Sequence, residues 1–109
     1  MKVDTSQFHQ AFFEETAEHL ADMERLLVAL DIDNPDAEQL NAIFRAAHSV
    51  KGGSGMFGFR EMTEVTHVLE SLLDLARKGS ARLAPAIIDT VLQTADLLGE
   101  LLQCYRRGA

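Results

Sequence analysis

Apolar residues recur every three to four positions along four segments of this chain, and this spacing is what most constrains its fold. A stripe of that period lies along one face of an α-helix, so each segment predicts an amphipathic helix with one face toward a core. No stretch shows the sustained alternation of β-branched and polar residues that is typical of a half-buried strand. The sequence therefore predicts an all-α fold.

Turn-forming residues separate the four segments and leave only short connections between them. Four such helices are expected to form an antiparallel up-and-down four-helix bundle. The predicted helices are about Thr5 to Leu30, from Pro35 or Asp36 onward, about Phe59 to Lys78 with Gly79 as the C′ residue, and about Pro85 to Tyr105. Their expected core positions are Phe8, Phe12, Met23, Leu27 and Leu30; Leu40, Ile43, Phe44, Ala47 and Val50; Met62, Val65, Leu69, Leu72, Leu73 and Ala76; and Ile87, Ile88, Val91, Leu92, Ala95, Leu98 and Leu102.

The chain of 109 residues has the length of a single domain. Its net charge of −7 would repel a phosphate backbone, which disfavours nucleic-acid binding. No apolar run reaches the roughly 20 residues that a membrane-spanning helix needs, and the N-terminus does not resemble an export signal. We therefore expect a cytoplasmic, monomeric domain. Cys104 is the only cysteine and is interpreted as a small apolar residue, and His19 as a residue at the edge of the core.

Residues 48–58 depart from the helical pattern because four of the seven residues from Gly52 to Gly58 are glycine. Each glycine inside a helix costs about 0.8–1 kcal/mol relative to alanine, so one interpretation is a flexible connection. The other is that the second helix continues, which places Gly52 and Gly55 on the same face as His48. Gly52, Gly53 and Gly55 would then leave room for another protein to approach the imidazole. The order of a phosphate-binding P-loop is missing.

His48 is predicted at the border between core and solvent, about a quarter turn from the centre of the apolar face of its helix. On the third helix His67 and Glu70 are three residues apart and project from one flank. If the two helices fold back about Phe57, position 48 comes level with about position 66. His48, Lys51, His67 and Glu70 are then expected to form one cluster at an accessible edge.

Such a cluster could serve three chemistries. Two histidines and a glutamate could bind zinc, but the usual ligand orders are missing and Lys51 would repel the cation, so no metal site is assigned. No serine or cysteine is placed beside a base as a nucleophile would require. Phosphoryl acceptance fits better, with His48 as nucleophile, Glu70 accepting the other ring N–H and orienting the imidazole, and Lys51 offsetting phosphoryl charge. A structural or docking bundle and a metal-binding bundle stay as alternatives.

The segment 44–53, which reads Phe-Arg-Ala-Ala-His-Ser-Val-Lys-Gly-Gly, resembles the phosphorylation motif of histidine-containing phosphotransfer (HPt) domains. More narrowly, it is similar to the N-terminal phosphotransfer domain of the bacterial chemotaxis histidine kinase. The resemblance covers nearly the whole chain. It extends to four further segments, namely Phe12-Phe13-Glu14-Glu15, the lead-in from Pro35 to Ile43, Phe57-Gly58-Phe59, and Thr66-His67-x-x-Glu70.

This resemblance implies that residues 1–109 form an HPt domain within a larger multidomain kinase, with a fifth helix often following. The Nε2 atom of His48 would be phosphorylated by the kinase's ATP-binding domain, in trans within a dimer. The group would then pass to an aspartate on response-regulator receiver domains that control flagellar rotation and receptor methylation, or a related motility system. Lys51, His67 and Glu70 match the positions around the phosphoacceptor, and His67 is either a neighbour or a second acceptor. The domain itself would catalyse no turnover and bind no cofactor, since ATP and Mg belong to the separate kinase domain.

Overall fold

The computed structural model describes residues 6–78 and 84–108. Within them lie four α-helices and no strand, as the apolar spacing predicts: α1 (Ser6–Ala29), α2 (Ala37–Met56), α3 (Arg60–Arg77) and α4 (Pro85–Arg106). The predicted limits are met to within a residue or two. Thr5 and the predicted C′ residue Gly79 lie outside the described residues, and a fifth helix stays a prediction.

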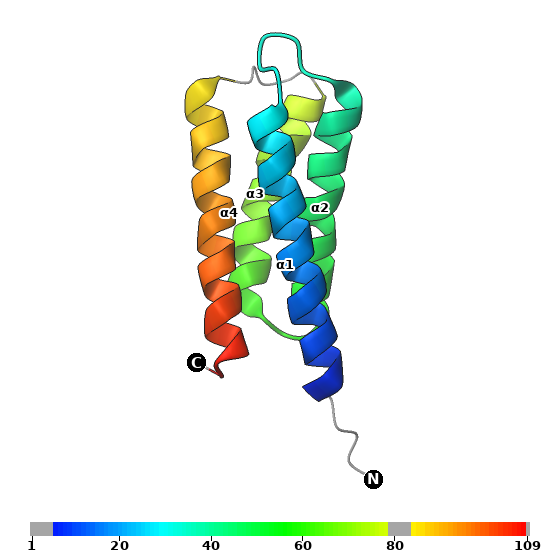
Figure 1. The fold of residues 1–109 in the computed structure, drawn as a ribbon, viewed down its shortest axis with the longest axis vertical. Helices are drawn as coiled ribbons and strands as arrows, with labels where there is room; N and C mark the ends of the chain where they lie inside the picture. The colour runs from blue at the N-terminus through cyan, green and yellow to red at the C-terminus, as the bar shows by residue number, and fades with distance from the viewer. Residues whose placement is uncertain (1–5, 79–83, 109) are drawn as a thin grey trace.

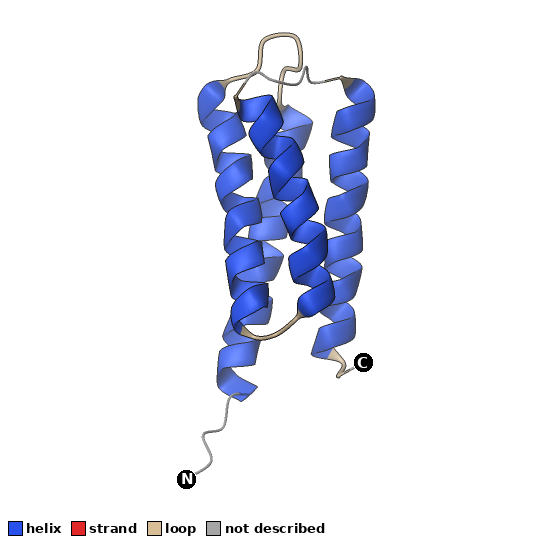
Figure 2. Ribbon diagram, turned by 180° about the vertical axis from the view of Figure 1, so that it is seen from behind, coloured by secondary structure: helices blue, strands red, loops and turns tan. Residues whose placement is uncertain are grey.

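Successive helices run in opposite directions and pack side by side, and α1 and α4 close the ring (Figure 1). α1 lies in front between α2 and α4, and α3 lies behind it. Figure 2 shows the opposite side, where α3 faces the viewer. The fold is therefore the predicted up-and-down four-helix bundle. None of the helices in the described part of the chain is long and apolar enough to cross a membrane.

The apolar stripes of all four helices meet in one core, but the N-terminal stripe was predicted partly wrongly. Phe8 is 49% exposed, because the first turns of α1 extend past the α2–α3 turn (Figure 1). Phe13 is buried instead, with its ring centroid 5.8 Å from that of Phe59, and Thr16 is buried beside it along the helix. His19 is half-buried, as expected at the edge of the core. The other buried apolar residues are Phe12, Leu20, Met23, Leu27, Leu30, Leu40, Ile43, Ala46, Ala47, Val50, Met62, Leu69, Leu73, Val91, Ala95, Leu98 and Leu102.

The start of α2 and the turn after it fix the alignment of α2 with α3. Asp36 caps α2, its carboxylate accepting a hydrogen bond of 2.7 Å from the backbone N–H of Glu38. α2 then continues through the glycines to Met56, so the interpretation as a continuous helix is confirmed. The chain reverses at Gly58, whose φ of +76° is costly for residues with a Cβ. This turn brings the C-terminal half of α2 alongside the first half of α3.

Candidate functional site

His48 and Glu70 come from neighbouring helices and touch across the α2–α3 seam. Nδ1 of His48 lies 3.1 Å from Oε1 of Glu70, as the fold-back about Phe57 predicts. A carboxylate can only accept a hydrogen bond, so Nδ1 carries the proton and donates it to Glu70. Nε2 is then the ring nitrogen with the free lone pair. The His48 side chain is 63% exposed, so another protein can reach it.

Lys51 meets the other oxygen of the same carboxylate. Its Nζ lies 2.8 Å from Oε2 of Glu70, an oxygen that is shielded from solvent and has no other polar partner among the described residues. Burial of Glu70 raises the pKa of its carboxyl, but Lys51 and His48 lower it by more, so the pKa of Glu70 lies below its ordinary value. Glu70 is therefore ionised at neutral pH. The structure places the Lys51 ammonium on the Nδ1 side of His48, at Glu70.

Phe44 and Arg77 extend the site toward the N-terminal half of α2, and neither was predicted as a site residue. The ring of Phe44 lies nearly parallel to the imidazole of His48, at 13° with 6.3 Å between centroids. The Arg77 guanidinium lies 3.9 Å from the centroid of the Phe44 ring and is anchored by Asp74 at 2.6 Å. Asp74 lies four residues after Glu70 and Arg77 lies seven residues after it. From this helical spacing the sequence could have predicted that all three lie on the same flank of α3.

His67 borders the site without touching its central residue. It is exposed on α3 and lines a hollow with Lys51, Gly52 and Gly55, and a second hollow with Phe44 and Glu70. Within the described residues it makes no side-chain hydrogen bond or ion pair. His48, Lys51 and Glu70 thus form the connected part of the predicted cluster, with His67 at its rim.

The three glycines predicted to give access differ in what surrounds them. A Cβ at Gly52 would meet nothing within 4 Å, and one at Gly55 would meet only Thr63, at 4.0 Å. A Cβ at Gly53 would lie 2.9 Å from the Phe12 ring. Gly52 and Gly55 therefore leave open space beside His48, whereas Gly53 lets α1 pack closely against α2.

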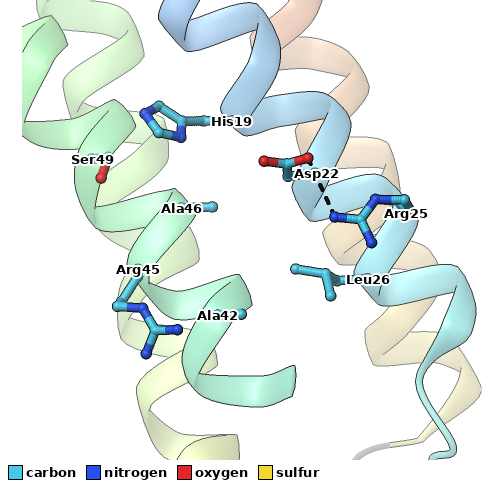
Figure 3. A pocket seen from close by; sticks show the side chains of 8 residues that line it. All are labelled: His19, Asp22, Arg25, Leu26, Ala42, Arg45, Ala46 and Ser49. Carbon is cyan, nitrogen blue, oxygen red and sulfur yellow. Dashed lines mark hydrogen bonds and ion pairs between the residues drawn. The ribbon is translucent and has the colours of Figure 1, made fainter. Parts of the chain in front are cut away.

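A groove lies between α1 and α2, and Figure 3 shows the side chains that line it. His19 and Asp22 extend from α1 toward α2, where Arg45 and Ser49 line the facing wall. Arg45 and Ser49 also line the hollow that contains His48, Phe44 and Arg77. In the described part of the chain no group of three or more His, Cys, Asp or Glu residues is placed to hold a metal ion.

The arrangement can present one exposed, unprotonated imidazole nitrogen while the half-buried carboxylate of Glu70 holds the other nitrogen. Comparison with known proteins finds domains of this kind. The family model of the Hpt domain matches residues 7–104 of this chain. The chain is 54% identical over 108 residues to the chemotaxis protein CheA of Salmonella typhimurium, an alignment covering 99% of this chain and 16% of that protein. The chain thus spans about one sixth of the length of that relative.

Two solved structures share the fold. The CheA phosphotransferase domain from Thermotoga maritima superposes with a TM-score of 0.85 and 30% identity, covering 93% of this chain and 96% of that one. The phosphorylated P1 domain of CheA3 from R. sphaeroides, solved in complex with CheY6, gives a TM-score of 0.84 and 26% identity, covering 94% and 81%. With the match spanning nearly the whole bundle and the histidine lying on its surface, the chain belongs to the Hpt domain family.

Proposed function

We propose that this domain is a phosphocarrier in which His48 accepts a phosphoryl group from a histidine kinase's ATP-binding domain and donates it to a receiver-domain aspartate. The observation that carries the proposal is the contact of Nδ1 with the ionised Glu70, which leaves Nε2 unprotonated and exposed. A carboxylate in this position fixes the tautomer and strengthens the nucleophile. The bundle supplies the acceptor atom and its orientation.

In the accepting step, the lone pair of Nε2 attacks the γ-phosphorus of a nucleoside triphosphate held by the kinase domain. The Nε2–P bond forms, and the bond from phosphorus to the bridging oxygen breaks, its electron pair leaving on the diphosphate. The imidazole gains positive charge, which Glu70 offsets through the Nδ1–H hydrogen bond. Lys51 in turn keeps Glu70 ionised and in place through the 2.8 Å ion pair.

In the donating step, an oxygen of the receiver aspartate attacks the same phosphorus from the side opposite Nε2. The P–N bond breaks and its electron pair returns to Nε2, which restores the imidazole. Both partners must therefore reach the same nitrogen, and the open space at Gly52 and Gly55 supports that access. The R. sphaeroides relative was solved with CheY6, which supports a receiver domain as partner here.

The setting of the domain is part of the same proposal. We place it as one domain of a chemotaxis-type histidine kinase in the cytoplasm, phosphorylated in trans within a kinase dimer. The nucleotide and Mg stay with the kinase domain, and this domain binds no cofactor. Membership of the Hpt family and the likeness to CheA proteins support this placement.

A labelling experiment tests the proposal. The domain is incubated with the ATP-binding portion of a CheA kinase and ATP labelled at the γ-position. We expect an acid-labile label on the wild-type domain and on His19→Gln, the matched control on α1, and no label on His48→Gln. Label that survives His48→Gln would contradict the proposal, and an unlabelled wild type would favour a docking bundle.

A further inference from the structure

Two cationic side chains of α2, Lys51 and Arg45, lie on different sides of His48. With about 100° per residue, Phe44 and Lys51 fall roughly 40–60° to one side of His48 on α2, and Arg45 falls about 60° to the other. The contacts agree, because Lys51 pairs with Glu70 of α3, whereas Arg45 lines the groove facing α1. Nδ1 is held by Glu70 of α3, so Nε2 is the ring nitrogen left for a phosphoryl group, and the hollow that His48 lines together with Arg45 offers a place for such a group.

Arg45 is an exposed cation whose charge is not paired. It makes no ion pair or side-chain hydrogen bond with any described residue, and it lines one hollow of about 520 Å³ together with His48. No acidic residue lines that hollow, and its other cation, Arg77, is bound to Asp74. Residues three apart on a helix have Cβ atoms about 5–6 Å from each other, so a guanidinium at position 45 can reach a group carried by His48.

Lys51 is poorly placed to contact a phosphoryl group carried by His48. Its ammonium lies 2.8 Å from Oε2 of Glu70, on the Nδ1 side of the ring. Turning it toward Nε2 would leave that solvent-shielded oxygen without the counter-charge that Lys51 provides, which is costly. Among the described residues, Arg45 is the cation without an ion-pair partner that shares a hollow with His48.

We propose that Arg45 contacts the phosphoryl group carried on Nε2 of His48 and is the cation that offsets its charge, while Lys51 serves Glu70. This inference rests on the proposed phosphocarrier function. A phosphoryl group on the ring carries close to two negative charges at neutral pH, and a planar guanidinium can donate two hydrogen bonds to its oxygens. The hollow of about 520 Å³ that Arg45 and His48 line together gives the group room.

The test uses phosphorylation without a partner protein, so that docking does not enter the result. The domain is phosphorylated chemically with phosphoramidate, and the ³¹P resonance absent from His48→Gln is followed as a function of pH. Because a nearby cation favours the dianion, we expect Arg45→Gln to raise the midpoint of the phosphoryl titration by about 0.2–0.7 pH unit. Arg45→Lys should recover most of the wild-type midpoint. Arg25→Gln, which removes an arginine from the same groove but on α1, should leave it unchanged.

A wild-type midpoint in Arg45→Gln would overturn the inference, as would a larger rise in Lys51→Gln than in Arg45→Gln. Either result leaves the phosphocarrier function standing, since His48 would still carry the group. If no resonance depends on His48, the proposed function fails and the inference fails with it. With the kinase domain and labelled ATP, Arg45→Gln should also accept phosphoryl at least about threefold more slowly than Arg25→Gln.

Discussion

Glu70 uses its two carboxylate oxygens for two different side chains of α2, and this division determines how His48 is presented. Oε1 accepts the hydrogen bond from Nδ1 of His48, and Oε2 pairs with Lys51. Replacing the carboxylate by an amide keeps the shape but removes the charge that fixes the tautomer. The arrangement leads to two predictions at the scale of single residues.

First, Glu70→Gln should slow phosphorylation of His48 by about tenfold or more, because removing the partner that orients a functional imidazole costs roughly 10–100-fold in comparable sites. The initial rate of label uptake from the kinase domain measures this. Glu100→Gln, an exposed position on α4, is the control, and circular dichroism should show the same helix content in both variants. An unchanged rate would remove the orienting role of Glu70.

Second, the free energy of unfolding should fall as the pH drops below about 4.5, the ordinary pKa of a glutamate side chain. The pKa of Glu70 is lowered in the folded domain, so its contribution is complete above the unfolded value and is lost as pH falls through the folded value. Urea unfolding at pH 7, 5 and 4 measures the trend. In Glu70→Gln the decrease should be shallower, and an equal decrease in both proteins would contradict the role of this ion pair.

The sequence predicted the contact between His48 and Glu70 because both lie on regular helices joined by a short turn. Helical spacing and one fold-back point are enough to align such positions. The sequence did not assign Lys51 to one side of the ring or reveal the unpaired charge of Arg45. Those facts depend on which rotamer a long side chain adopts, and helical spacing alone does not determine that rotamer.

At the scale of helices, the glycine-rich end of α2 allows close packing against α1 and also leaves open space at the surface. Gly53 allows α1 to approach, because a Cβ there would lie 2.9 Å from Phe12, while Gly52 faces open space. The sequence left open whether these glycines form a loop or a helix. Packing decides in favour of the helix, since the buried Val50 and Ser54 hold this turn against the core.

The two glycines should therefore respond oppositely to alanine. Gly53→Ala should lower the free energy of unfolding by about 1–3 kcal/mol, the usual cost of overpacking. Gly52→Ala should raise it by up to about 1 kcal/mol through helix propensity, yet slow transfer from the kinase domain because a methyl group enters the space beside His48. Chemical denaturation and label uptake measure the two effects. Stabilisation by Gly53→Ala would contradict the close approach.

At the scale of the whole molecule, an aromatic cluster joins both ends of the chain to the α2–α3 turn. The ring of Tyr105 on α4 stacks on Phe59 with 4.3 Å between centroids, and its hydroxyl donates a hydrogen bond of 2.7 Å to Glu61. Phe12 and Phe13 of α1 contact the same Phe59 ring. Amphipathic spacing predicted the bundle but not this cluster, since Phe8 was expected inside and Phe13 was not.

Tyr105→Leu should lower the free energy of unfolding by about 1–2 kcal/mol, through loss of ring stacking and of the hydrogen bond to Glu61. Tyr105→Phe keeps the ring and should cost less. Neither variant touches the contacts of His48, so label uptake by the folded domain should equal that of the wild type. A slowed uptake in Tyr105→Phe would show that the cluster and the site are coupled.

The position of the phosphoryl group on the imidazole is the most direct test of the proposal that Nε2 of His48 is the acceptor atom. The domain is enriched in ¹⁵N, phosphorylated by the kinase domain, and examined by NMR for coupling between phosphorus and the ring nitrogens of His48. Because Nδ1 donates to Glu70, we expect coupling to Nε2 and a proton retained on Nδ1. Phosphorus bound to Nδ1, or to a residue other than His48, would contradict it.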